Sequence, residues 1–122
     1  MADARCDIEL GPARIAGARI ARSFRSRLLG EMGAGRGRPA QPLLIPGCRR
    51  VHMMFMRVPL DIVAVGAGRV VGVDTVAPWG RVPRHAGCRS VIELPAGTCA
   101  REGIEAGCPV AAKAAGGAAD AG

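Results

Sequence analysis

The sequence is poor in aromatic residues, in lysine and in long apolar runs. Its 122 residues include two Phe, one Trp and no Tyr, which is too few for a protein that stacks single-stranded bases on aromatic side chains. No apolar run approaches 18 residues, so a membrane-spanning helix is excluded. The first 30 residues lack an uninterrupted apolar stretch before a cleavage site, so we expect no secretory signal and a cytoplasmic protein.

Glycine and proline are abundant, at 18 and 9 residues. This content is typical of a loop-rich protein and disfavours a helical bundle. The large apolar side chains concentrate in residues 43–94, which marks the position of one modest core. We therefore expect one globular domain over residues 14–111, an N-terminal segment over residues 1–13 and a disordered Ala/Gly tail over residues 112–122.

The charge is strongly positive and unevenly distributed. The formal net charge is +7, and Lys113 is the single lysine among 17 basic residues. Ten arginines lie in residues 1–50 against four acidic residues. This asymmetry permits a nucleic acid or an acidic partner, although we favour the simpler explanation that a genome biased toward Arg, Ala and Gly codons replaced Lys by Arg. We expect only weak, non-specific binding of nucleic acid.

Cysteine usage indicates a reducing compartment. The chain has an odd number of cysteines, Cys6, Cys48, Cys88, Cys99 and Cys108. Without a secretory signal we expect all five to be reduced and unpaired.

Short β-branched runs separated by Gly or Pro predict a small antiparallel sheet. The expected strands cover residues 43–45, 51–56, 60–65, 69–76 and 91–94, and Ile15 and Ile20 indicate one more. Gly66, Ala67 and Gly68 predict a hairpin turn between two of these strands. The fold class is mainly β (α+β), a single small domain with a partly closed, barrel-like sheet and one or two short helices.

Two short helices are expected beside the sheet. Ser23 is suited to cap a helix that ends near Gly30 or Gly33, and Thr98 to cap a turn over residues 99–102 that Gly103 closes. The glycines at 66, 68 and 72 resemble a dinucleotide-binding motif, but their spacing is wrong and a strand follows in place of a helix. We therefore predict no cofactor.

A zinc site is a weak alternative, with Cys48, His52, His85 and Cys88 as ligands. In an extended segment Cys48 and His52 lie roughly 13 Å apart, too far for two ligands of one tetrahedral ion unless a turn intervenes. We predict no metal. The same four residues offer thiol and imidazole groups for nucleophilic catalysis, but no spacing selects a pair.

Asp61 interrupts an apolar strand, so its carboxylate must find hydrogen-bond donors. We expect backbone or Arg donors in a structural role. The alternative is a carboxylate in a cleft, paired with Arg57 or His52.

The segments CRRVHMMFM (residues 48–56), PLDIV (59–63), ELPAG (93–97) and GIEAG (103–107) resemble the domain of unknown function 192 family, small bacterial and archaeal proteins. The resemblance covers residues 14–111. It implies a mainly β domain and no established activity. The chain departs from the family pattern at Arg27 and Cys108. The positions that match are His52, Met56, Pro59, Asp61, Glu93, Pro95, Ala96, Gly97, Gly103 and Gly107.

No complete catalytic set is evident, so we favour a non-enzymatic binding or accessory domain with an unknown partner. One alternative is a small hydrolase that uses Asp61 with His52 or Glu93, which requires these residues to converge. The other is a weak nucleic-acid binder, which requires Arg14, Arg19, Arg22, Arg25 and Arg27 to share one face.

Overall fold

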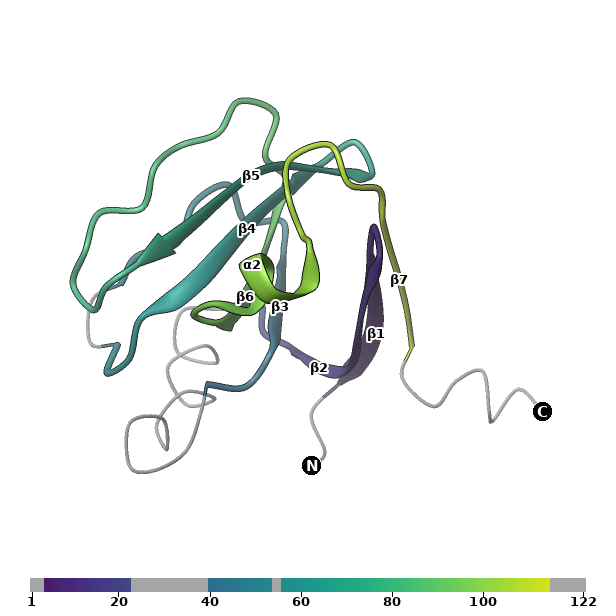
Figure 1. The fold of residues 1–122 in the computed structure, drawn as a ribbon, viewed down its shortest axis with the longest axis horizontal. Helices are drawn as coiled ribbons and strands as arrows, with labels where there is room; N and C mark the ends of the chain where they lie inside the picture. The colour runs from purple at the N-terminus through teal and green to yellow at the C-terminus, as the bar shows by residue number, and fades with distance from the viewer. Residues whose placement is uncertain (1–3, 23–39, 54–55, 115–122) are drawn as a thin grey trace.

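The computed structural model describes residues 4–22, 40–53 and 56–114. Within these residues it contains a curled half-barrel sheet and one short helix (Figure 1), which confirms the predicted fold class. The helix is α2 (Thr98–Glu102). The strands are β1 (Arg5–Leu10), β2 (Ala13–Ile20), β3 (Leu43–Pro46), β4 (Leu60–Gly66), β5 (Arg69–Val76), β6 (Ser90–Pro95) and β7 (Val110–Ala114).

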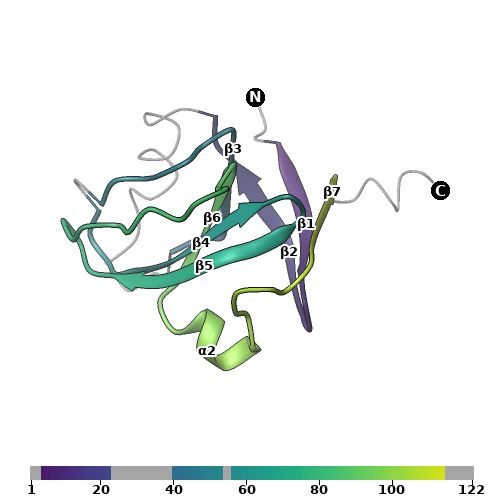
Figure 2. The ribbon, with the colours of Figure 1, turned by 90° about the horizontal axis from the view of Figure 1, so that it is seen from above.

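The strands follow the order β5-β4-β6-β3-β2-β1-β7 across the sheet. Neighbours are antiparallel, apart from the parallel contact of β2 with β3. Figure 2 shows the sheet curling so that β1 and β7 approach the far end of β5. There Arg69 forms an isolated bridge with Pro109, and Val70 N donates to Cys108 O. The curl is therefore nearly closed at this end.

The β4–β5 hairpin forms where the sequence predicts it. Leu60 pairs with Val76, and Gly66 pairs with Arg69. Ala67 and Gly68 lie between the strands with φ of 52° and 74°, the left-handed conformations that a two-residue hairpin turn requires. β5 begins directly after this turn, so the predicted hairpin is confirmed, whereas a dinucleotide-binding turn leads into a helix.

Side chains on the concave face form an inner cluster. β1 and β5 are far apart in the strand order, and their residues meet here because the sheet curls. Helix α2 and Ile104 close one side of the cluster. Its largest buried members are Ile8, Leu10, Val63, Ile92 and Leu94.

The opposite face of the same strands carries an outer cluster, covered by connections between strands. Because side chains alternate along a strand, β4 contributes Leu60, Ile62 and Ala64 to this face and Val63 to the inner one. The outer cluster also contains Leu43, Ile45, Val51, Met53, Met56, Val76, Val82, Cys88 and Val91.

The expected strand over residues 51–56 is not formed in its described part, residues 51–53 and 56. Val51, Met53 and Met56 are buried in the outer cluster all the same. The Met53 carbonyl accepts hydrogen bonds from Met56 N and from Trp79 N. Both donors lie in connections between strands, so these bonds are not part of a β-sheet ladder. These three residues cover the sheet without joining it, a role that periodicity does not distinguish from a strand.

The sheet includes residues on both sides of the expected domain limits. Residues 5–10, assigned from the sequence to an N-terminal segment, form β1, and residues 112–114 of the expected tail lie in β7. The strand expected around Ile15 and Ile20 is confirmed as β2. The helix expected after Ser23 and residues 115–122 lie outside the described part of the chain.

Candidate functional site

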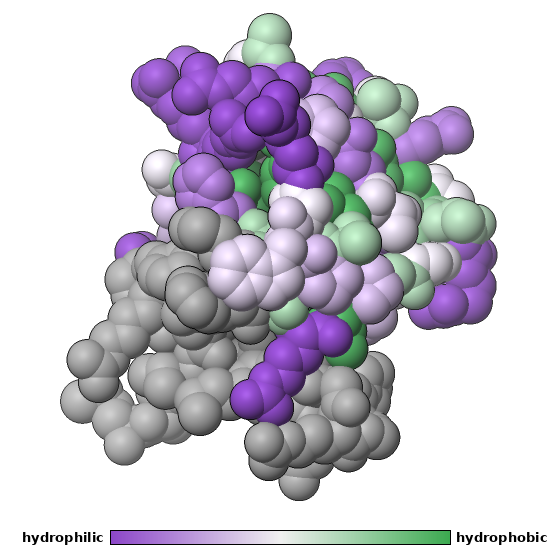
Figure 3. Space-filling view, turned by 90° about the vertical axis from the view of Figure 1, so that its left-hand side faces the viewer, coloured by the Kyte–Doolittle hydropathy of each residue, from purple (hydrophilic) through white to green (hydrophobic). Residues whose placement is uncertain are grey.

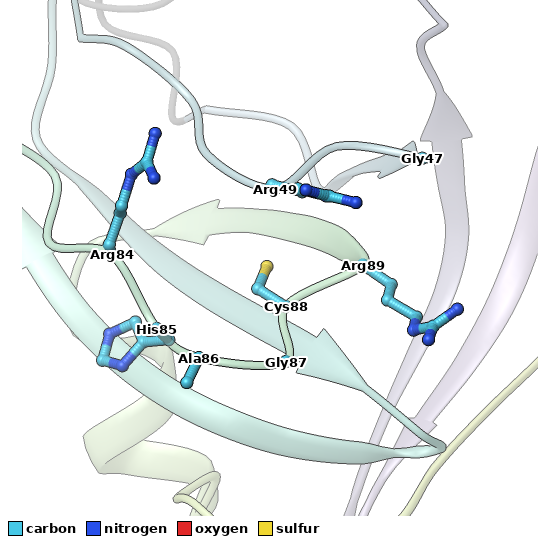
Figure 4. A pocket seen from close by; sticks show the side chains of 8 residues that line it. All are labelled: Gly47, Arg49, Arg84, His85, Ala86, Gly87, Cys88 and Arg89. Carbon is cyan, nitrogen blue, oxygen red and sulfur yellow. The ribbon is translucent and has the colours of Figure 1, made fainter.

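A cavity of about 770 Å³ opens between the end of β3 and the connection from β5 to β6 (Figure 4). Arginine is the commonest residue of its lining, and no acidic residue takes part. The connection between β5 and β6 runs along the left-hand side of the molecule in Figure 1. Figure 3 shows this side from the front, with hydrophilic residues gathered in its upper part. The lining residues are Gly47, Arg49, Arg84, His85, Ala86, Gly87, Cys88 and Arg89.

The segment of residues 82–89 has no regular secondary structure, yet hydrogen bonds fix it to the scaffold at both ends. Arg50 Nε donates to Val82 O at 3.0 Å. At the other end Arg89 N donates to Val65 O at 2.8 Å. The cavity wall is therefore held in place by β4 and by the segment after β3.

Two glycines of the hairpin allow this segment to approach the sheet. A Cβ atom on Gly66 would overlap the carbonyl of Gly87, and one on Gly72 would overlap the His85 imidazole ring. Both glycines have negative φ, so the absence of a side chain, and not an unusual backbone conformation, is what these positions require. The cavity wall thus packs directly on the backbone of β4 and β5.

His85 holds the middle of the same segment. Its Nε2 lies 2.6 Å from Asp74 Oδ2 on β5, and both side chains are one quarter exposed. The ring lies over β5, while the sulfur of Cys88 points to the opposite side of the segment, toward Arg49 (Figure 4). The thiol and the imidazole therefore do not form a nucleophile–base pair.

Asp61 is buried, with 1% of its surface exposed. Its Oδ1 accepts from Thr75 Oγ1 at 2.6 Å, and its Oδ2 accepts from Cys99 N at 2.9 Å. The carboxylate thus joins β4, β5 and the first turn of α2. The cleft hypothesis paired Asp61 with Arg57 or His52, and neither is a partner in these two hydrogen bonds. The backbone N–H of Cys99 is a donor of the kind that we expected if Asp61 has a structural role.

Asp61 also corrects the predicted start of the helix. The residue before α2 is Gly97, with a φ of 92°, and no side chain of the local sequence caps the helix. The hydroxyl of Thr98 donates instead to Pro95 O at 2.6 Å. The acceptor for the Cys99 N–H comes from β4, whereas the predicted end at Gly103 is confirmed by its left-handed conformation.

The thiol of Cys99 lies beside this carboxylate. Burial raises the pKa of Cys99 to about 12, and the charge of Asp61 and a hydrogen bond to it act in the same direction. A thiol with this pKa is a poor nucleophile at neutral pH. Cys99 is therefore a packing residue of the inner cluster.

The hydrolase candidates do not converge. Asp61 pairs with Leu94 and Ile62 with Glu93, so Glu93 shares the outer face with Ile62, while Asp61 faces the inner cluster. Glu93 is completely buried, and His52 lies exposed in the segment before β4. Asp61 and Glu93 thus point to opposite sides of the sheet.

The four zinc candidates are only partly brought together. Cys88 Sγ lies 3.7 Å from Cys48 O, but His85 faces Asp74. Among the described residues no three His, Cys, Asp or Glu side chains form a group able to hold a metal ion. All five cysteines are free thiols in the structure.

The arginines of β2 share one face because of a β-bulge. The register with β1 shifts between Cys6 and Ile8, so the partner strand has an extra residue near Gly17, whose φ is 67°. Arg14 and Arg19 therefore lie on the same face of the sheet, where Arg14 is exposed and Arg19 is partly buried. Glu9 and Asp7 lie on this face too, and Asp7 Oδ2 is 3.7 Å from Arg14. Arg22 is exposed beyond β2, and Arg25 and Arg27 lie outside the described residues.

Three of the positions that match the family motifs lie in the core or beside the start of a strand or of the helix. Met56 is buried in the outer cluster, Pro59 is exposed before β4, and Gly97 precedes α2. Sequence reasoning missed the three cavity arginines. Arg49 lies within the family-like segment of residues 48–56 but is not one of its matching positions, and Arg84 and Arg89 lie in a connection without a recognisable motif. Their only sequence signal was an excess of arginine.

No helix in the described part of the chain combines the length and the apolar character needed to cross a membrane.

Comparison with known proteins identifies a family but no activity. No curated protein matches the chain. A protein of unknown function from Novosphingobium aromaticivorans has a similar fold, with a TM-score of 0.67 and 23% identity over 88% of this chain and 83% of the other. A putative transcription regulator from Sinorhizobium meliloti has a TM-score of 0.68 and 20% identity, over 91% and 94%. The profile of the DUF192 family, described as an uncharacterised ACR, matches residues 9–112, so the chain belongs to this family.

Proposed function

We propose that the protein is a non-enzymatic binding domain and that the cavity between residues 47–49 and 84–89 is its binding site. The observation that carries this proposal is the anchored wall of the cavity. Residues 82–89 are fixed by Arg50, by Val65 O and by the contact of His85 with Asp74. A binding site on a wall held in this way loses little conformational entropy when a ligand binds. The free thiols suit a reducing, cytoplasmic location.

The hydrolase alternative has less support. Both oxygens of Asp61 accept hydrogen bonds within the protein, and Glu93 lies on the other face of the sheet. In the cavity itself, the thiol of Cys88 lacks an imidazole base because His85 faces Asp74. A general base or nucleophile must be within hydrogen-bond reach of its partner.

The nucleic-acid alternative has a specific weakness. Asp7 and Glu9 lie among the arginines of the β1–β2 face, which reduces the attraction of this face for phosphates. The S. meliloti protein is named a putative transcription regulator, but at 20% identity the likeness concerns the fold. We therefore favour a small ligand.

The test is a ligand survey with a readout located at the cavity. ¹⁵N-labelled protein is titrated with a panel of neutral, cationic and anionic metabolites, and the amide shifts of residues 47–49 and 84–89 are followed. We expect at least one compound to shift these amides and to be recovered chemically unchanged. Conversion of a bound compound by the wild type, lost in Asp61→Asn, would establish an enzyme instead.

A further inference from the structure

We infer that the cavity binds the phosphate group of a small organic phosphate; this inference rests on the proposed function of the cavity as a binding site.

The first argument is the charge of the lining. Three arginines line the cavity and no acidic residue does. The carboxylate of Asp74, on the packed strand β5, is 2.6 Å from the Nε2 atom of His85. The cavity therefore has a positive potential that an anionic group can neutralise.

The second argument is that these guanidinium groups are available. Within the described residues, the side chains of Arg49, Arg84 and Arg89 make no hydrogen bond or ion pair. Some arginines elsewhere are engaged, such as Arg14 with Asp7 and Arg50 with Val82 O. Because all three cavity arginines are exposed, a ligand reaches them without breaking an internal ion pair.

The third argument is the placement of the side chains. Arg49 and Arg84 both lie on the side of the segment toward which the Cys88 sulfur points, and Arg49 comes from the facing connection (Figure 4). Arg89 is turned away from Cys88. Figure 4 also shows the guanidinium groups of Arg49 and Arg84 directed apart, so we assign these two as the direct ligands after their side chains rotate toward each other, and Arg89 contributes charge.

The chemistry of guanidinium selects the anion. Its planar N–H groups form paired hydrogen bonds with phosphate and carboxylate oxygens. A phosphate monoester carries a charge of about −1.5 to −2 at neutral pH and three acceptor oxygens, which suits two or three arginines better than a single carboxylate does. The volume of about 770 Å³ lies within the range of small-molecule sites and leaves room for an organic part beside the phosphate.

The experiment compares four probes by calorimetry and by the amide shifts of residues 47–49 and 84–89. The probes are ribose 5-phosphate, ribose, inorganic phosphate and acetate. We expect ribose 5-phosphate to bind most tightly and ribose not to bind. Arg49→Gln and Arg84→Gln should each weaken binding at least tenfold. Arg101→Gln, an exposed arginine on α2 outside the cavity, is the matched control and should leave binding unchanged.

Failures of the two proposals are distinguishable. If ribose binds as tightly as its phosphate, or if acetate binds and both phosphates do not, the phosphate inference is wrong and the binding domain stands. Inorganic phosphate binding as tightly as ribose 5-phosphate would exclude an organic ligand part. Equal weakening by Arg101→Gln would show that only net charge matters and would overturn the site. If no probe here and no compound of the wider survey shifts the cavity amides, the proposed function is wrong as well.

Discussion

The carboxylate of Asp61 on β4 accepts a hydrogen bond at 2.9 Å from the backbone N–H of Cys99, 38 residues further along the chain. The same carboxylate accepts from the hydroxyl of Thr75 on β5. One buried side chain thus satisfies a donor at the start of a helix whose own sequence provides no capping side chain.

Replacing Asp61 should therefore destabilise the fold. We expect Asp61→Ala to lower the free energy of unfolding by roughly 1–3 kcal/mol, because it leaves the buried N–H of Cys99 without a partner and removes the hydrogen bond from the exposed Thr75. Asp61→Asn keeps an acceptor oxygen and should cost less, and Thr75→Val removes one hydrogen bond only. Urea denaturation of the three variants measures the order. A variant Asp61→Ala as stable as the wild type would contradict the structural role and favour a catalytic one.

The thiol of Cys99 predicts a loss of stability at alkaline pH. Burial and Asp61 hold its pKa near 12 in the folded protein, against 9.0 for an unperturbed thiol. Because the folded pKa is the higher one, stability is intact below about pH 9 and decreases as the pH rises toward 12, where the unfolded chain ionises first. Denaturation midpoints between pH 8 and 11 measure this decline.

Cys99→Ala is the matched variant for this measurement and should show a shallower alkaline decline. A smaller dependence should persist because burial also raises the pKa of Cys6. An unchanged slope in Cys99→Ala would show that the thiol ionises equally easily in both states.

The two glycines under the cavity wall should respond differently to alanine. In Gly66→Ala the new Cβ meets the carbonyl of Gly87, which is backbone, whereas in Gly72→Ala it meets the side chain of His85. We expect Gly66→Ala to be the more destabilising, by more than about 1 kcal/mol, as overpacking usually costs 1–3 kcal/mol.

Removing the imidazole ring of His85 shows how much of the destabilisation by Gly72→Ala comes from a clash with the ring. His85→Ala should abolish most of the cost of Gly72→Ala in a double-mutant cycle of unfolding free energies. Additive effects of the two changes would show that the ring does not pack on Gly72.

Binding of duplex DNA should be weak and independent of sequence. Asp7 and Glu9 reduce the attraction of the arginine face, so any complex formed near 50 mM salt should be lost by about 200 mM salt. Fluorescence anisotropy with two unrelated duplexes measures this. Tight binding that prefers one sequence at physiological salt would reverse the order of the proposed functions.

The sequence was sufficient for features that depend on neighbouring residues. Gly66, Ala67 and Gly68 predicted the hairpin because the residue types of a two-residue turn with positive φ are sufficient to indicate it, without contacts to distant residues. The end of α2 at Gly103 is local in the same way. Val51, Met53 and Met56 were correctly placed in the core but wrongly in a strand, because burial and strand pairing give the same apolar pattern.

The features that the sequence did not predict depend on distant residues. The partners of Asp61 come from positions 75 and 99, and the packing of His85 on Gly72 depends on how a connection crosses β5. The bulge at Gly17 reverses the side-chain alternation of β2 and so puts Arg14 and Arg19 on the same face, whereas strict alternation over five positions would separate them. The cavity joins Arg49 to Arg84 across 35 positions, which no local pattern encodes.

The pairing of β1 with β7 has a consequence for engineering. Cys6 at the start of the sheet lies opposite Ala114 at its end, so the first and last strands bring the two extremities of the described fold together. Domains with adjacent extremities tolerate circular permutation and insertion into a host loop. This fold can therefore be inserted as a domain into a surface loop of another protein with its hairpins intact.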